Sequence, residues 1–318
     1  MYLIWDGAKD LAGNVLHLRT RFVTNKRLDG QVVVITGANT GIGRETALQL
    51  TSLGAKVIMG CRDLNRAGSA ADYIKANNKN AVLSVIQLDL SSLESVREFA
   101  KKVSETESRI DILINNAGIA GIPEQRTTDG FEMHFGTNHL GHFLLTLLLL
   151  PLLRSAPKAR VVSVSSSFYL VGKIHFDNIN LSDGAYTNWK AYNQSKLANV
   201  LFSRELAKRL GANSTISTYS LHPGVIKTDI GRNYRPYVVK GVYNMIGRLL
   251  FLTPRMGAQT SLYCALEDSI ENKSGFYYQD CKRFELSPIA MDDTVAERLW
   301  DLSVDLVNLE EHLNLPSS

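Results

Sequence analysis

The feature that most constrains the fold is a regular alternation of short, β-branched apolar runs with helix-length segments. Parallel strands buried on both faces are almost continuously apolar, whereas the helices between them have a 3.6-residue periodicity. Six runs are expected to be strands: 32–36, 56–61, 82–89, 110–115, 160–165 and 215–221. Segments such as 42–53, 92–104 and 138–153 are expected to be helices. The alternation predicts a doubly wound parallel α/β sheet, Rossmann-like, in a single domain over residues 30–318.

Residues 1–29 differ from this pattern because their apolar residues recur at alternating steps of four and three. These residues are Ile4, Ala8, Leu11, Val15, Leu18 and Phe22. We therefore expect an N-terminal extension that forms an amphipathic helix. Two interpretations remain open, a helix packed on the domain or on a second subunit and a helix at a membrane surface. Asp6 and Asp10 offset some of its basic residues, which favours packing.

Charge and cysteine content exclude several classes of protein. The formal net charge of +4 is small and spread along the chain, so a nucleic-acid partner is not expected. Cys61, Cys264 and Cys281 are too few and too far apart for a disulfide framework or a metal site. No run reaches the roughly 18 apolar residues of a spanning helix, and the N-terminus lacks a signal-peptide pattern. We expect the protein in the cytoplasm or attached peripherally to an intracellular membrane facing the cytosol, with the mitochondrion as an alternative.

A glycine-rich turn directly follows the first predicted strand and opens the next helix. Its spacing is G-x-x-x-G-x-G, which permits a tight turn and brings backbone N–H groups close to a pyrophosphate at the helix N-terminus. Glycine at a turn also has a purely geometric explanation, so the position between strand and helix carries the argument. We predict a dinucleotide-binding site formed by Gly37, Asn39, Thr40, Gly41, Ile42 and Gly43.

The end of the second predicted strand indicates which dinucleotide binds. A site for NAD would place Asp or Glu there to hold the ribose 2′-OH. This chain has Cys61 followed by Arg62, and a guanidinium forms charge-assisted hydrogen bonds with a 2′-phosphate. The alternative is a solvated Arg62 with Asp63 at the ribose. The missing carboxylate favours NADP(H).

Tyr192 and Lys196 are the candidate proton-transfer pair. Free tyrosine has a pKa near 10, and a lysine one helical turn away favours the phenolate and lowers that pKa. The i, i+4 spacing falls within a segment that is predicted to be helical over 188–210. The same Tyr-x-x-x-Lys spacing occurs twice more without a helical pattern, at Tyr169/Lys173 and Tyr278/Lys282.

Several motifs occur together in the order of a known family. They are Thr36–Gly43, Asn115–Gly118, Tyr192–Lys196 and Pro223-Gly224. In this order they resemble the short-chain dehydrogenases/reductases. Longer stretches are similar to the retinol dehydrogenase branch of that family: 138–146, 195–202 and 221–225. The resemblance extends from about Leu28 to Leu306.

This resemblance implies an NADP(H)-dependent oxidoreductase that interconverts a hydrophobic carbonyl compound and its alcohol by hydride transfer. Retinal and retinol are the substrate pair that it implies first, and other lipid aldehydes or steroids are the alternatives. Two other classes remain open, a catalytically silent NADP-binding scaffold and a lipid-surface protein. The family commonly forms dimers or tetramers, so a homo-oligomer is also expected.

The resemblance also assigns catalytic roles. Tyr192 is the general acid/base, and Lys196 lowers its pKa and hydrogen-bonds the nicotinamide ribose. Ser166 orients the substrate carbonyl, a register that rests on the resemblance because serines flank it on both sides. Asn138 holds a water of the proton relay, although asparagine at the start of a predicted helix is equally well explained as an N-cap.

Other residues are assigned to cofactor binding by the same resemblance. Asp89 contacts the adenine, and Asn115 and Asn116 brace the ribose and the central sheet. Val225 and Thr228 belong to the loop that holds the nicotinamide carboxamide.

The substrate side has a variable loop and one departure from the branch. Residues 231–255 occupy the position of the variable substrate loop and are apolar and basic, which suits a helix packed on the domain or contact with an anionic membrane surface. After the catalytic serine the branch carries a small residue and then histidine, whereas this chain has Phe168 and Tyr169. We expect these bulkier side chains to reshape the rim of the pocket.

Overall fold

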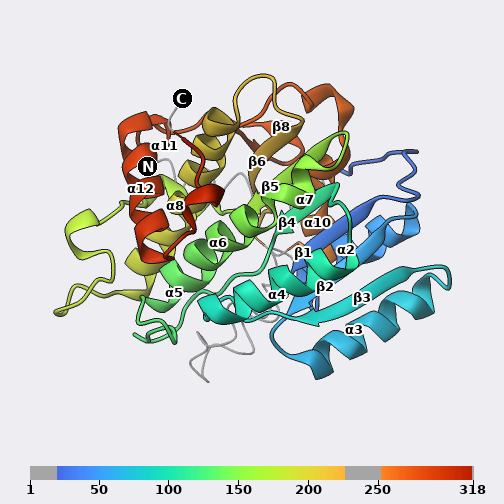
Figure 1. Ribbon diagram of the computed structural model, residues 1–318, viewed down its shortest axis with the longest axis horizontal. Helices are drawn as coiled ribbons and strands as arrows, with labels where there is room; N and C mark the ends of the chain where they lie inside the picture. Colours follow the sequence, from blue (N-terminus) through green and yellow to red (C-terminus); the bar gives the residue numbers. More distant parts are fainter. Residues whose placement is uncertain (1–19, 226–251, 317–318) are drawn as a thin grey trace.

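The computed structural model describes residues 20–225 and 252–316, which form one α/β domain around an eight-stranded sheet (Figure 1). The strands are β1 Val32–Thr36, β2 Lys56–Cys61, β3 Val82–Gln87, β4 Ile112–Asn115, β5 Ala159–Val164, β6 Ile216–His222, β7 Phe276–Gln279 and β8 Lys282–Arg283. Their order is β3-β2-β1-β4-β5-β6-β7-β8, parallel throughout except for the β7–β8 pair. The predicted doubly wound sheet is confirmed. Its chain order reverses between β1 and β4, where such sheets bind ligands.

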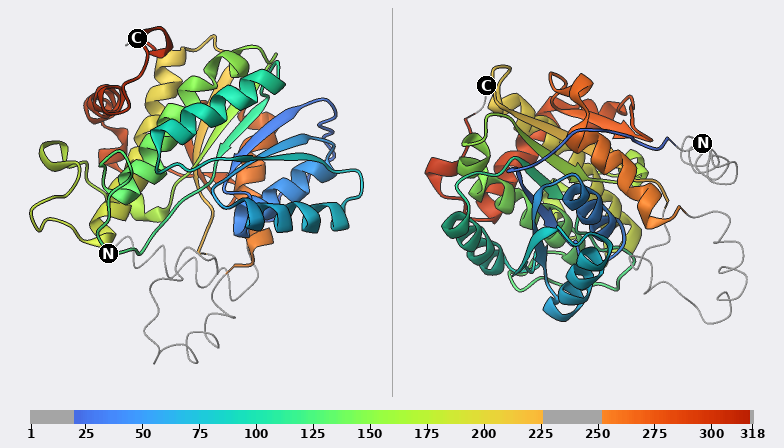
Figure 2. Two further views of the ribbon diagram at one scale, coloured as in Figure 1. Left: turned by 60° about the horizontal axis from the view of Figure 1, so that its bottom comes forward. Right: turned by 90° about the vertical axis from the view of Figure 1, so that its right-hand side faces the viewer.

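Helices cover both faces of the sheet (Figure 2). One layer contains α2 Gly41–Ser52, α3 Leu64–Asn77 and α10 Pro254–Leu266. The other layer contains α4 Leu93–Thr106, α6 Gly141–Leu148 and α8 Asn188–Leu210. The helix α12 Asp293–Leu306 packs on α8. Alternate residues of β1 face the two layers, because Val32 and Val34 join one core and Val33 and Ile35 the other. The shorter elements are α5 Met133–Phe135, the π-helical η1 Gly136–Leu140, α7 Leu150–Arg154, η2 Ser167–Val171, η3 Phe176–Asn178, η6 Asp268–Ile270, α11 Pro288–Met291 and η7 Glu311–Leu313.

The helix predicted over 138–153 is divided into η1, α6 and α7. In η1 the Gly141 N–H donates to the Gly136 carbonyl, a hydrogen bond that spans five residues and leaves a bulge in the helix. α6 ends before Pro151, which has no N–H to continue the helical hydrogen bonding. Asn138 therefore lies inside a π-helical turn.

Residues 20–28 are not helical. The Thr20 N–H donates to the Asp280 carboxylate at 2.9 Å, and the Phe22 N–H donates to a glutamine of α10 at 3.1 Å. The predicted amphipathic helix is therefore wrong at Phe22, because these backbone groups bond to the domain and not within a helix. Residues 1–19 of that prediction lie outside the described residues.

Val225 and Leu252 are the two ends of a long connection. The Leu252 N–H donates to the Val225 carbonyl at 3.0 Å, so the two ends of the segment 226–251 meet. Thr228 and most of the predicted substrate loop over 231–255 lie outside the described residues. Among the residues that are described, no helix has both the length and the apolar character needed to cross a membrane.

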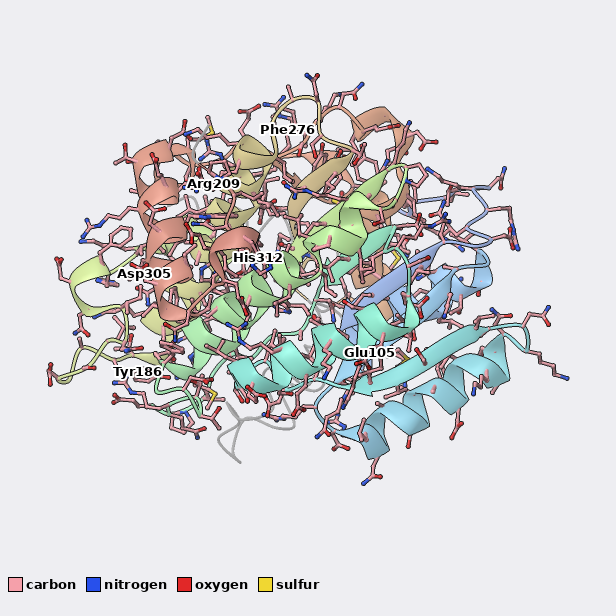
Figure 3. All side chains as sticks on the ribbon, in the orientation of Figure 1. Glu105, Tyr186, Arg209, Phe276, Asp305 and His312 are labelled. Carbon is pink, nitrogen blue, oxygen red and sulfur yellow. The ribbon has the colours of Figure 1, made fainter. Side chains whose placement is uncertain are left out.

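Arg209 ties the C-terminal part of the chain to α8 (Figure 3). Its guanidinium donates to Glu205 at 2.6 Å and to the Leu315 carbonyl at 2.7 Å. The same group lies over the Trp300 ring of α12, 4.7 Å from its centroid. The side chains of Arg209 and Glu205 are each only 2% exposed, so this ion pair is buried.

Candidate active site

The predicted site residues gather around a cavity of about 510 Å³ at the carboxyl ends of the central parallel strands. Those that line it are Gly37, Asn39, Thr40, Gly41, Ile42, Gly43, Arg62, Asp89, Asn116, Ser166, Tyr192, Lys196 and Val225. Asn115 and Asn138 are buried and do not line the cavity. The structure thus brings residues from most of the chain to the place where the sheet reverses its order.

The turn between β1 and α2 forms one end of the cavity. Gly37 and Gly41 have φ of +67° and +54°, in the left-handed region that glycine adopts without strain. A Cβ at Gly43 would lie 2.4 Å from the Gly37 carbonyl oxygen, so this glycine lets α2 pack closely on the turn. Thr40 is the N-cap residue but makes no side-chain capping hydrogen bond to the first turn of α2. This end of the cavity therefore fits the pyrophosphate of a dinucleotide.

Side chains that follow β2 and β3 line the same end. Arg62 is exposed, and Arg66 lines the cavity with it. The Asp63 carboxylate accepts the Arg66 N–H at 3.0 Å and caps α3, a structural role that favours Arg62 as the ribose-side residue. Asp89 is held by the Ser91 N–H at 2.9 Å and the Ser91 hydroxyl at 2.6 Å.

Asn115 and Asn116 brace the floor of the site. The Asn116 side chain donates to the Thr36 carbonyl at 2.7 Å, which joins the ends of β1 and β4. The Asn115 side chain donates to the Thr146 hydroxyl at 2.9 Å and so joins β4 to α6. These contacts fit the predicted bracing of the central sheet.

Tyr192, Lys196 and Ser166 meet at the other end of the cavity. Tyr192 and Lys196 lie on successive turns of α8, and the Lys196 Nζ is 5.6 Å from the centroid of the Tyr192 ring. The same Nζ donates to the Val164 carbonyl at 3.1 Å, and the Ser166 hydroxyl hydrogen-bonds Tyr192. The neighbouring Ser165 hydroxyl instead donates to the Lys196 carbonyl at 2.7 Å. The Ser165 hydroxyl is thus engaged by the main chain of α8, which leaves Ser166 as the serine available to Tyr192.

Burial shifts the pKa values of both proton-transfer groups. It raises the pKa of Tyr192 above its usual value of 10, and the hydrogen bond with Ser166 acts in the opposite direction. It lowers the pKa of Lys196 to about 8. The spacing to Lys196 predicts a lowered tyrosine pKa, but the loss of solvation on burial outweighs the effects that lower it.

Asn138 is not a helix N-cap, because it lies within the π-helical turn. Its side-chain oxygen accepts the Ile119 N–H at 2.9 Å, and its amide donates to the Ile119 carbonyl at 3.0 Å and to the Ser195 hydroxyl at 2.9 Å. The Ser195 hydroxyl in turn donates to the Tyr192 carbonyl at 2.8 Å. The Asn138 side chain therefore joins the loop after β4 to the helix that carries Tyr192.

An aromatic pair lies beside the tyrosine: Phe168 was expected at the rim and lines the cavity, whereas its partner Trp189 was not predicted. Phe168 stacks on Trp189 with ring centroids 5.2 Å apart and meets the Tyr192 ring edge-on at 6.1 Å. Trp189 is 47% exposed, and its position three residues before Tyr192 on the predicted helix was the signal that could have found it. Tyr169, expected at the rim, is buried against Tyr277 and does not line the cavity.

The other two Tyr-x-x-x-Lys copies do not form such a site. Tyr278 lies on β7 and Lys282 on β8. Tyr169 lies in η2, and Lys173 follows after that segment has ended. Of the three copies, the one on the long helix lines the cavity with both of its residues, Tyr192 and Lys196.

A second cavity, of about 610 Å³, contains none of the predicted site residues. It is lined by the end of α8 and by the beginnings of β6 and β7. It therefore lies at the amino ends of these parallel strands, whereas the first cavity lies at the carboxyl ends. Within the described parts of the chain, no group of three or more His, Cys, Asp or Glu side chains is placed to hold a metal ion.

Comparisons with known proteins assign the chain to a family. Residues 31–238 match the short chain dehydrogenase family, and the chain belongs to it. Human retinol dehydrogenase 14 is 46% identical over 96% of this chain and 95% of its own length. Human retinol dehydrogenase 12 is 48% identical over 90% of this chain and 89% of its own. The chain is thus an oxidoreductase of the retinol dehydrogenase branch that acts on CH–OH groups.

Solved structures agree with this assignment. An uncharacterised protein from Mycobacterium paratuberculosis is 36% identical, covers 93% of this chain and 100% of its own, and superposes with a TM-score of 0.74. A short chain dehydrogenase from Escherichia coli CFT073, solved as a complex with NADPH, has the same fold, with 22% identity, coverage of 81% and 99%, and a TM-score of 0.64. The family and the glycine-rich turn together indicate a nicotinamide cofactor.

Proposed function

We propose that this protein is an NADPH-dependent reductase that converts a hydrophobic aldehyde, retinal first among them, into its alcohol. The observation that carries the proposal is one cavity with two chemically different ends. One end has the first turn of α2 and Arg62, which suit a dinucleotide with a 2′-phosphate. The other end has Tyr192, Ser166 and Lys196, which suit proton transfer to a carbonyl oxygen.

The residues of the chain supply the proton and the orientation. Bound NADPH supplies the hydride that the carbonyl carbon accepts. Ser166 donates a hydrogen bond to the carbonyl oxygen, and Tyr192 gives that oxygen its proton. Because burial raises the Tyr192 pKa, the phenol keeps its proton at neutral pH and is suited to act as an acid. That protonation state supports reduction as the direction of the reaction.

Two observations support an apolar substrate. The curated relatives at 46–48% identity are named retinol dehydrogenases. Phe168 and Trp189 place a stacked aromatic pair beside Tyr192, where an extended apolar chain gains contact area. Other lipid aldehydes and steroid ketones are the alternatives, and a silent NADP-binding scaffold is the rival from another class.

The test follows NADPH absorbance when the purified full-length protein meets all-trans-retinal, a medium-chain aldehyde or a steroid ketone, with NADH in parallel. We expect turnover with NADPH and fastest turnover with retinal. Tyr192→Phe should abolish turnover and keep NADPH binding, because only the proton donor is lost. Tyr278→Phe is the matched control, since its hydroxyl is buried without a hydrogen-bond partner among the described residues.

Each outcome separates the rivals. Substantial turnover by Tyr192→Phe would contradict the acid role of this tyrosine. NADPH binding without turnover of any substrate would favour the silent scaffold. A steroid ketone that is reduced faster than retinal would replace the retinoid as the proposed substrate.

A further inference from the structure

A buried hydrogen-bond chain connects the nucleotide-binding turn with Asn138 through His142. His142 lies on α6 and is 2% exposed. Its Nε2 is 2.8 Å from the Thr36 hydroxyl at the end of β1, and its Nδ1 is 3.0 Å from the Asn138 main-chain carbonyl. The hydride and proton transfers proposed above do not use this imidazole.

The hydrogen bonds of Thr36 determine which ring nitrogen carries the proton. The Thr36 hydroxyl oxygen accepts the N–H groups of Asn116 and Ala117, each at 2.9 Å. A hydroxyl has two acceptor lone pairs and one hydrogen, so its own hydrogen is directed to His142 Nε2. Nε2 is therefore the acceptor, and the proton sits on Nδ1, which donates to the Asn138 carbonyl.

The ring remains neutral under physiological conditions. Burial lowers the pKa of His142 to about 4; the hydrogen bond to Asn138 raises it, and the nearby charge of Lys196 lowers it further. The His142 backbone is also held, because its carbonyl accepts the Thr146 hydroxyl at 2.7 Å and Thr146 accepts from Asn115. The donor that faces the Asn138 carbonyl is therefore fixed in protonation, tautomer and position.

The Asn138 side chain has no hydrogen-bonding hydrogen left for a ligand in the cavity. Both of its amide hydrogens and its oxygen are engaged with Ile119 and Ser195. The Asn138 main-chain carbonyl is bonded by the imidazole, so His142 holds the residue whose side chain joins Ile119 to Ser195. Ser195 passes this contact on, because its hydroxyl donates to the Tyr192 carbonyl. A Cβ at Gly118 would lie 3.4 Å from both Asn138 Oδ1 and Lys196 Nζ, so Asn138 and the ammonium group border the same small space.

We propose that His142 is a positioning residue: by holding Asn138 it fixes, through Ser195, the turn of α8 that carries Tyr192. The inference rests on the proposed function, in which Tyr192 gives the carbonyl oxygen its proton. It adds a physical link from the end of β1, through Thr36 and the imidazole, to the proton donor. A dinucleotide that orders the glycine-rich turn would thereby also stabilise the position of Tyr192.

Two isosteric substitutions separate the two hydrogen bonds. In His142→Asn the side-chain amide takes the place of Nδ1–H and can still donate to the Asn138 carbonyl, but it does not reach Thr36. In His142→Gln the amide takes the place of Nε2 and keeps the Thr36 contact, but it leaves the Asn138 carbonyl without this donor. Both variants remove the ring and so perturb packing to a similar extent.

The readouts are kcat, the KM for NADPH and the solvent deuterium isotope effect on kcat, in full-length protein that binds NADPH and melts cooperatively. We expect His142→Gln to lower kcat about five- to tenfold, the fold-change of one buried hydrogen bond, with an unchanged KM and a larger isotope effect. His142→Asn should stay within about twofold of the wild type. Equal losses in both variants, or no loss in His142→Gln, would overturn the proposal.

A second measurement needs no variant and no turnover. Nitrogen-15 NMR of the histidine rings in the wild-type protein should find His142 neutral, with its proton on Nδ1, from pH 5.5 to 8. A proton on Nε2, or a ring that titrates in this interval, would overturn the hydrogen-bond chain. Absence of turnover in the wild type would instead count against the proposed function, so the two failures are distinguishable.

Discussion

At the scale of single residues, burial moves the two proton-transfer groups in opposite directions. It raises the pKa of Tyr192 and lowers that of Lys196 to about 8. Both shifts favour the neutral form, because each charged form loses solvation. The phenol is therefore protonated throughout the neutral range, while the lysine approaches its titration there. The site is thus sensitive to pH through its lysine.

Lys196 should produce a step in the pH profile near 8. Lys196 is charged at pH values below its pKa of about 8. A role that needs the ammonium is therefore present below pH 8 and is lost as the pH rises through that value. We expect kcat to fall on the alkaline side of about pH 8. Lys196→Arg keeps its charge and should show lower activity, by roughly tenfold, without this step. The measurement is kcat from pH 6 to 10 for both proteins, and a step that persists in the variant would assign it to another group.

Arg62 should determine the preference for NADPH over NADH. Loss of a charge-assisted hydrogen bond costs about 1.5–3 kcal/mol, so Arg62→Ala should weaken NADPH binding about 10- to 150-fold and leave NADH unaffected. Cofactor fluorescence titration measures both affinities. Arg283→Ala on β8, with its side chain 52% exposed, is the control. An unchanged NADPH/NADH ratio in Arg62→Ala would show that this arginine does not select the cofactor.

At the scale of elements, α8 organises the site. The Thr187 hydroxyl caps its first turn, and Gly211 with φ of +80° ends it. On the 23-residue helix between them, Trp189, Tyr192 and Lys196 follow at helical spacing. One rigid element therefore positions both the proton-transfer pair and the Trp189 ring that stacks on Phe168.

Trp189 should discriminate between substrates by their apolar length. Trp189→Ala removes one aromatic contact, worth about 0.5–1.5 kcal/mol, so kcat/KM for retinal should fall about two- to tenfold. A short aldehyde that does not reach the ring should be unaffected. Val171→Ala, another exposed apolar residue that does not line the cavity, serves as the control. An equal loss for short and long aldehydes would assign Trp189 to the stability of α8.

Sequence patterns predicted the elements well where the signal was local. The six expected strands, the glycine-rich turn and the helix that carries Tyr192 and Lys196 follow from periodicity and spacing, and the structure places each of them within a few residues of the expected range. The π-helical turn around Asn138 was missed, because apolar periodicity does not report a bulge. The raised Tyr192 pKa and the role of His142 were missed as well. Both depend on burial and on partners distant in sequence, such as Thr36, which no local pattern encodes.

At the scale of the whole molecule, one buried ion pair connects the C-terminal part with the site helix. Arg209 contacts Glu205 within α8, Trp300 of α12 and the Leu315 carbonyl. Because α8 also carries Tyr192, the contacts of Arg209 stabilise both the packing of the C-terminal part and the helix that positions the tyrosine. The cost of breaking the pair is large, since it leaves a buried charge without its partner.

Arg209→Met should destabilise the whole domain by about 3–5 kcal/mol, because Glu205 would remain buried and uncompensated. The double variant Glu205→Leu/Arg209→Met should recover most of this loss, since neither charge is then buried. Denaturant unfolding of the three proteins measures the difference. A double variant no more stable than the single one would show that the Leu315 and Trp300 contacts, and not the charge pair, dominate.

The hydrogen bond between Leu252 and Val225 has an engineering consequence. Val225 and Leu252 are joined by one 3.0 Å hydrogen bond, so a connection of another length can be closed between them at a small cost in loop entropy. We therefore expect the segment between these two residues to be exchangeable as a cassette. A chimera that carries the corresponding segment of another retinol dehydrogenase should keep the sheet, the nucleotide turn and the proton-transfer pair in place.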